Sequence, residues 1–167
     1  MPRVLIIAYG NPMRCDDGLA WRAADELEGK FPTHEFEILR THQLAPELAE
    51  TVSRSQAVIF VDAASSGGAN AQPGEVHEAP IGLSAGPPRF SHHLSPAAVI
   101  ALASQLYGAH PPAFSVTLTG QSFDHGEGLS PVVVAAIPAL VARIETLVQS
   151  LLSPTSGRSI RCWKTRA

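Results

Sequence analysis

The sequence predicts a three-layer α/β/α domain built around a mainly parallel β-sheet. Strand and helix signals alternate along the chain with short connections, which is the order that parallel βαβ units require. The first strand candidate, Val4–Ala8, is a continuous apolar run, as expected for a parallel strand that is covered on both faces. Because the sequence contains no internal repeat and no interdomain linker, we expect residues 1–153 to form a single domain.

The first half of the chain provides three strand candidates and two helix candidates. The strands are bounded by turn residues, and the first helix has apolar residues at helical spacing and stops at Gly29. The third strand is an apolar run that ends at Asp62. The elements predicted here are the strands 4–8, 35–40 and 57–61 and the helices 18–28 and 46–50.

The second half begins with an irregular stretch. Residues 63–73 read as a loop, 74–79 as a strand, and 81–90 as too rich in Gly and Pro for either element. Helices are then expected from Ser95-Pro96 to Gly108 and from Ser130-Pro131 to Leu151, since Ser followed by Pro favours a helix start. The remaining elements of this half are the strand 114–119 and a kink of the last helix at Pro138.

Composition narrows the class of protein. A chain of 167 residues, 45% of them hydrophobic, is long and apolar enough to bury a core, which excludes a disordered chain. The only cysteines, Cys15 and Cys162, cannot form a disulfide framework, so we expect a reducing, cytoplasmic compartment. The sequence has no run of about 18 uninterrupted apolar residues, so we expect no membrane partner.

Charge is divided unevenly along the chain. Residues 1–157 hold 8 basic and 15 acidic residues, a net charge of −7, whereas the last ten residues hold four bases and no acid. An acidic body argues against nucleic acid as a partner, because phosphate binding needs clustered Lys and Arg. We expect residues 154–167 to form a flexible, solvated basic tail.

Candidate functional residues follow from the position of the strand ends. In open parallel sheets, ligands bind beyond the carboxyl ends of the strands. Asp16 and Asp17 lie in the loop after the first strand, Asp62 ends the third strand, and the doublet His92-His93 precedes a helix. Two carboxylate positions and an imidazole position are therefore expected at one edge of the sheet.

Several other chemistries lack their motifs. The sequence contains no GxGxxG, no GxxxxGK[ST], no nucleophile elbow, and neither CxxC nor HExxH. A thiol nucleophile at Cys15 beside His93 is disfavoured, because two neighbouring aspartates oppose formation of the thiolate.

The remaining donor set consists of Asp17, Asp62 and one histidine of the doublet His92-His93. Two carboxylates and an imidazole suit a divalent transition ion such as Ni²⁺ or Zn²⁺. The residues alone leave alternatives open: Asp16 and Asp17 also suit a helix N-terminus, and at least one of the two histidines is expected to be an ordinary surface residue.

These residues resemble a known family, the hydrogenase maturation proteases. The resemblance runs from about residue 3 to residue 151 and is carried by four segments in order: GNPMRCDDG, VIFVDA, SHHLSP and GEGLSPVVVAAIP. It implies a mixed five-stranded sheet with one antiparallel strand, for which 74–79 is the candidate. Tyr9 is a departure, because small residues are common in the family at that position, and it is expected to narrow the turn without touching a ligand.

The resemblance also implies the site. The family's metal ligands correspond to Asp17, Asp62 and His93, with His92 as the alternative histidine. The same three residues would then be the catalytic set. Asp16 is the spare acid, interpreted as a cap and hydrogen-bond acceptor with a proton-transfer role as the lesser alternative.

The activity implied is that of an endopeptidase that removes the C-terminal peptide of a nickel-loaded [NiFe]-hydrogenase large-subunit precursor. The nickel is supplied by the substrate, although zinc or another divalent ion suits the same ligands. Two alternatives stay open: a non-proteolytic nickel or precursor chaperone, and an aspartic-type hydrolase with Asp17 and Asp62 as its dyad. Residues 81–90 border the expected site and are either part of the precursor-binding cleft or a plain surface loop.

Overall fold

A computed structural model describes residues 3–66, 71–82 and 94–153. Every strand and helix predicted from the sequence is present there. In chain order the elements are β1 (Val4–Tyr9), the 3₁₀ turn η1 (Cys15–Gly18), α1 (Leu19–Leu27), β2 (Phe36–Thr41), α2 (Leu48–Ser53), β3 (Ala57–Ala64), β4 (Val76–Pro80), α3 (Pro96–Tyr107), β5 (Ala113–Thr119) and α4 (Pro131–Leu152).

The sheet has five strands in the order β2-β1-β3-β5-β4. β1 pairs in parallel with both β2 and β3, and β3 pairs in parallel with β5. β4 is antiparallel to β5 at the edge of the sheet. The expectation of a mixed sheet whose odd strand is the fourth is therefore confirmed.

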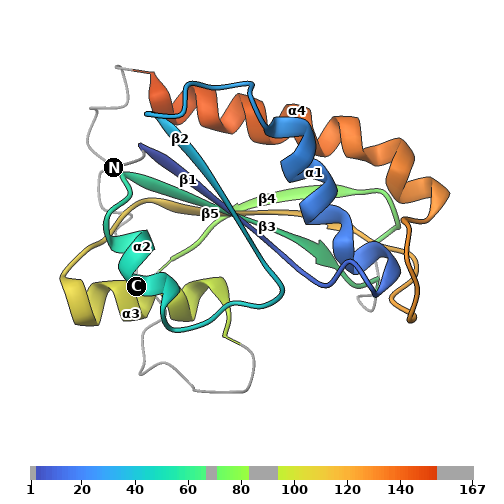
Figure 1. The fold of residues 1–167 in the computed structure, drawn as a ribbon, viewed down its shortest axis with the longest axis horizontal. Coiled ribbons are helices and arrows are strands. Elements are labelled where there is room, and N and C mark those ends of the chain that lie inside the picture. Colours follow the sequence, from blue (N-terminus) through green and yellow to red (C-terminus); the bar gives the residue numbers. More distant parts are fainter. Residues whose placement is uncertain (1–2, 67–70, 83–93, 154–167) are drawn as a thin grey trace, which may run out of the picture.

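Helices cover both faces of the sheet, which gives the three layers that the sequence predicts. Figure 1 shows α1 and α4 on one face and α2 and α3 on the other. The side chains of β1 alternate between the two cores: Val4, Ile6 and Ala8 pack with α1 and α4, whereas Leu5 and Ile7 pack with α2 and α3. A strand buried on both faces needs the continuous apolar run seen in its sequence.

The helices after the midpoint begin as their sequence signals predict. At the start of α3, the hydroxyl of Ser95 accepts a hydrogen bond from the backbone N–H of Ala98, and Pro96 stands in the first turn. Gly108 ends α3 in the left-handed conformation with φ of 65°, which glycine adopts without strain. α4 starts after Ser130 and is continuous through Pro138, which is exposed.

Among the described residues, α4 alone is long and apolar enough to cross a membrane, judged by length and composition. Its apolar stripe, which includes Ile137, Leu140 and Ile144, is buried in the core on the α1 side of the sheet. One such helix is weak evidence for a membrane span, because core helices of globular domains have the same length and composition.

The third strand is longer than the sequence predicts. β3 continues to Ala64, so Asp62 is part of the strand and lies opposite Thr117 of β5, instead of following the strand end. The extra residues are paired because β5 runs alongside them as far as Thr119. The basic tail, residues 154–167, lies outside the described residues.

Candidate functional site

A pocket of about 330 Å³ lies at the carboxyl ends of β1, β2 and β3. β1 is the central strand of these three, so the chain after β1 leaves towards β2 and returns later to β3 on the other side. This is the topological switch point at which open α/β sheets bind their ligands. The described residues that line it are Tyr9, Gly10, Asn11, Arg14, Asp17, His42, Gln43, Leu44, Asp62 and Leu94.

Asp17 reaches the pocket from the loop that follows β1. The loop turns at Gly10, whose φ is 139°, and a Cβ atom there would lie only 2.0 Å from the backbone carbonyl oxygen of Asp17. Glycine is therefore required for the close approach of the two backbone segments. The backbone N–H of Asn11 donates a hydrogen bond of 2.8 Å to Oδ2 of Asp17, which fixes the carboxylate beside the strand end.

Asp62 reaches the same pocket from β3. Its Oδ1 accepts a hydrogen bond of 2.7 Å from the backbone N–H of Ala63. Burial raises the pKa of Asp62 to about 6, hydrogen bonding from the Tyr9 hydroxyl and Ala63 opposes this rise, and the negative charge of Asp17 adds to it. Burial, followed by the charge of Asp62, also raises the pKa of the Tyr9 hydroxyl. Tyr9, the last residue of β1, therefore contacts a proposed ligand, and the expectation that it touches none is wrong.

Asp16 points elsewhere. It is fully buried and does not line the pocket. Its carboxylate accepts four hydrogen bonds from the segment that leads into α4, donated by the backbone N–H groups of Gln121, Ser122 and Ser130 and by the Ser130 hydroxyl. Burial pushes its pKa upwards, but these hydrogen bonds outweigh burial and lower the pKa overall.

The role of Asp16 is thus that of a structural acceptor, as the sequence interpretation has it, but its partners differ from those expected. Neither η1 nor α1 has a side-chain hydrogen bond at its N-terminus. Asp16 instead ties the first loop to Ser130, the residue that precedes α4. Cys15 is also held against this segment, because its backbone N–H donates to the carbonyl oxygen of Gly126, and it does not line the pocket.

The predicted histidine ligand and its alternative, His93 and His92, lie outside the described residues, as do most of residues 81–90. Within residues 3–66, 71–82 and 94–153, no group of three or more His, Cys, Asp or Glu side chains is placed to hold a metal ion. Of the predicted site residues, Asp17 and Asp62 are the two that the described part of the structure brings to one pocket.

Sequence reasoning missed His42, which follows β2 directly and lines this pocket. The rule that points to Asp62 applies equally to the end of the second strand, where His42 stands, so strand position alone is a sufficient signal for it. Arg14 was missed as well; its guanidinium donates to the carbonyl oxygen of Phe123 and borders the pocket.

The sequence matches no protein-family model and no curated protein. Solved structures do match it. The hydrogenase maturating endopeptidase HybD from E. coli has a TM-score of 0.72 at 25% identity and covers 89% of this chain and 93% of its own. The [NiFe] hydrogenase maturation protease HybD from Thermococcus kodakarensis has a TM-score of 0.68 at 23% identity, covering 87% and 99%.

A third match is the [NiFe] hydrogenase maturation protease HycI from Thermococcus kodakarensis KOD1, with a TM-score of 0.69 at 22% identity over 88% of this chain and 92% of that chain. All three matched proteins are named as endopeptidases or proteases of hydrogenase maturation. Over almost nine-tenths of its length, this chain has the fold of the hydrogenase maturation endopeptidases, as the sequence resemblance implies.

Proposed function

We propose that this protein is an endopeptidase that removes the C-terminal peptide from a nickel-loaded [NiFe]-hydrogenase large-subunit precursor. The observation that supports the proposal most strongly is the convergence of Asp17 and Asp62 on one pocket at the switch point of this fold. The named activity of the structural neighbours gives the reaction class. The hydrogenase precursor is the one partner proposed, with neither nucleic acid nor a membrane, and the cytoplasm is the compartment expected for it.

The nickel in this proposal belongs to the substrate. Carboxylate oxygens and an imidazole nitrogen are suitable ligands for Ni²⁺, and Zn²⁺ suits the same set. Asp17 fits this role because its Oδ2 is held by Asn11 while its Oδ1 has no hydrogen-bond partner among the described residues. Asp62 fits because a half-buried carboxylate whose pKa is raised by loss of solvent gains more from a cation than an exposed one does. By resemblance, His93 would be the third ligand, with His92 as the alternative.

The protein's own part in the reaction is to bind and orient. Asp17 and Asp62 would dock the nickel centre of the precursor, and this would bring the segment just beyond it into the pocket. Nickel held in this way polarises a nearby carbonyl or acidifies a bound water. A carboxylate oxygen that is not engaged with the ion would accept the proton of the attacking water.

The aspartic-type alternative requires the two carboxylates to share a proton through a direct hydrogen bond. No such bond joins Asp17 and Asp62 in the described part of the chain; one oxygen of Asp17 accepts from Asn11 and one oxygen of Asp62 accepts from Ala63. The raised pKa of Asp62 is due first to burial, and Asp17 is the smallest of its causes. The contacts therefore favour a docking role for the two carboxylates over a dyad.

Single alanine substitutions of Asp17, Asp62 and His93 test the three-ligand proposal with the nickel-loaded precursor as substrate. We expect each substitution to abolish the loss of the C-terminal peptide, measured by mass spectrometry. Full activity of His93→Ala would contradict the ligand set, and a loss confined to His92→Ala would transfer the role to the neighbouring residue. A chaperone without protease activity would bind the precursor and leave its mass unchanged.

A further inference from the structure

His42 lies on the far side of the pocket from Asp62. It follows β2, whereas Asp62 belongs to β3, and β1 runs between these two strands. All three of His42, Asp17 and Asp62 line the same cavity, and the His42 residue is exposed. An exposed imidazole at the rim of a pocket is accessible to whatever enters it.

The imidazole of His42 has a fixed orientation. It stacks on the indole of Trp21 in α1, with the ring centroids 5.2 Å apart and the planes within 9° of parallel. The indole N–H of Trp21 donates a hydrogen bond of 3.3 Å to the carbonyl oxygen of Thr41, the last residue of β2. Trp21 is thus attached to the same strand end that carries His42.

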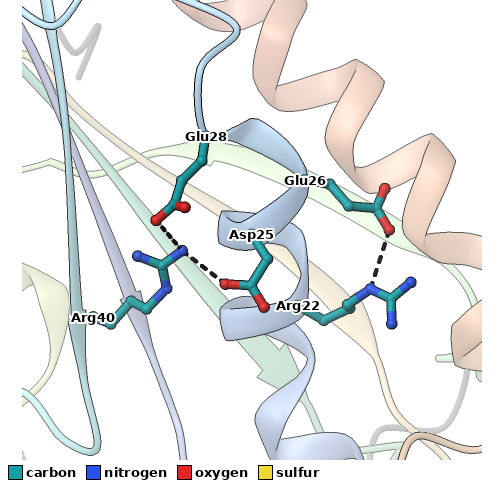
Figure 2. Close-up of polar contacts among 5 residues, drawn as sticks. All are labelled: Arg22, Asp25, Glu26, Glu28 and Arg40. Carbon is teal, nitrogen blue, oxygen red and sulfur yellow. Dashed lines mark hydrogen bonds and ion pairs between the residues drawn. The ribbon is translucent and has the colours of Figure 1, made fainter.

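A second connection between α1 and β2 supports this arrangement. Figure 2 shows the guanidinium of Arg40, in β2, between the carboxylates of Asp25 and Glu28. The nitrogen–oxygen distances are 2.8 Å and 2.7 Å. Such surface pairs stabilise a fold only slightly, but this one joins β2, two residues before His42, to Asp25 and Glu28 at the end of α1.

His42 is not grouped with the two carboxylates as a metal ligand. In the described part of the chain no three His, Cys, Asp or Glu side chains are placed to share an ion, and this includes His42 with Asp17 and Asp62. Nor do the ring nitrogens of His42 form a hydrogen bond with any described residue. The ring therefore presents nitrogen atoms at the rim of the pocket with no partner among the described residues. A group whose orientation is fixed in advance loses little entropy when it binds a ligand.

We propose that His42, oriented by Trp21, is a substrate-contact residue that hydrogen-bonds the polypeptide segment of the precursor as it enters the pocket. The proposal rests on the proposed function. An imidazole provides at least one N–H donor in either protonation state, and a backbone carbonyl of an extended peptide segment is its natural acceptor. Trp21 is a positioning residue in this account, because it acts through His42.

The test is steady-state cleavage of the nickel-loaded precursor by single and double variants. For His42→Ala we expect KM to rise about 3- to 10-fold, because the variant loses one hydrogen bond to the substrate. We expect kcat to change by less than about twofold. Trp21→Ala should raise KM by a smaller factor, and the double variant should be no worse than His42→Ala, since Trp21 contributes only through His42. If Trp21→Ala folds poorly, Trp21→Phe, which keeps an aromatic surface, replaces it in these measurements.

The matched control is His34→Ala, an exposed histidine at the opposite end of β2, which should leave KM and kcat unchanged. An unchanged KM in His42→Ala, or additive effects of the Trp21 and His42 substitutions, would overturn the proposal. Calorimetry with Ni²⁺ alone should give the same result for wild type and His42→Ala, and a loss of Ni²⁺ binding confined to the variant would make His42 a ligand instead.

Failure of this inference is distinguishable from failure of the proposed function. If the wild-type protein does not shorten the precursor, the proposed function is wrong whatever His42 does. The contact is then tested directly by the Kd for the nickel-loaded precursor, which should rise by the same factor in His42→Ala and stay constant in His34→Ala. An equal Kd for both variants would refute the contact.

Discussion

Replacing Asp62 by Asn should stabilise the protein at neutral pH while abolishing the proposed activity. Burial, opposed by hydrogen bonding from Tyr9 and Ala63, raises the pKa of Asp62 from 3.8 to about 6. A group whose pKa is higher in the folded state contributes stability below its unfolded pKa, and this is lost as the pH rises through the folded pKa. A pKa difference of about 2 corresponds to about 3 kcal/mol, which partial exposure reduces to about 1–2 kcal/mol.

The assay is thermal unfolding in the presence of a chelator, so that no ion occupies the pocket. At pH 7.5 we expect Asp62→Asn to raise Tm by roughly 2–8 °C, and at about pH 4 the two melting temperatures should converge. Glu37→Gln, which removes an exposed carboxylate from β2, is the control and should leave Tm nearly unchanged at both pH values. A gain that is absent at pH 7.5, or equally large at pH 4, would refute the assignment of a buried, unfavourable charge to Asp62.

Three further substitutions test the architecture around the pocket. Asp16→Ala should cost about 3–5 kcal/mol in urea unfolding, because it removes a fully buried acceptor shared by three backbone N–H groups and a hydroxyl. Asp17→Ala loses one backbone bond and should cost about 1 kcal/mol, so similar costs for both would contradict the assignment of distinct roles. Gly10→Ala should lower stability by roughly 2–4 kcal/mol and reduce precursor cleavage, because the new Cβ would meet the backbone of Asp17. A variant with wild-type stability would disprove this clash. Pro138→Ala should raise stability by about 1–3 kcal/mol and leave cleavage unchanged, because it restores a backbone hydrogen bond inside α4 at an exposed position. A loss of stability would show that Pro138 makes favourable contacts.

The fold was predictable because its signals are local. The apolar run Val4–Ala8 is typical of a strand in a sheet that is covered on both faces, and its side chains do enter both cores. Ser95-Pro96 starts α3 through a local hydrogen bond from Ala98 to the Ser95 hydroxyl. Ser130-Pro131 also marks a helix start correctly, although the Ser130 side chain bonds to Asp16 and not to its own helix. Boundaries were less accurate: α2 begins at Leu48 because Ala49 and Val52 are the residues that its packing buries.

The candidate site was predictable only in part. The rule that ligands bind at the carboxyl ends of parallel strands leads to Asp17 and Asp62, because it depends on strand positions alone. The partners of Asp16 were not predictable, since they come from residues 121–130, more than 100 positions away, and only the folded chain brings them together. The stacking of His42 on Trp21 likewise depends on how α1 packs beside β2.

The most direct test of the central claim compares the nickel-loaded and nickel-free forms of the same hydrogenase large-subunit precursor after incubation with this protein. Intact-mass spectrometry measures whether the C-terminal peptide is released, and Asp17→Ala is the inactive control. We expect the nickel-loaded precursor to lose the peptide when it is incubated with the wild-type protein. The nickel-free precursor, and either form incubated with Asp17→Ala, should keep it. Retention of the peptide by both forms would contradict the protease, and equal cleavage of both would contradict recognition through nickel.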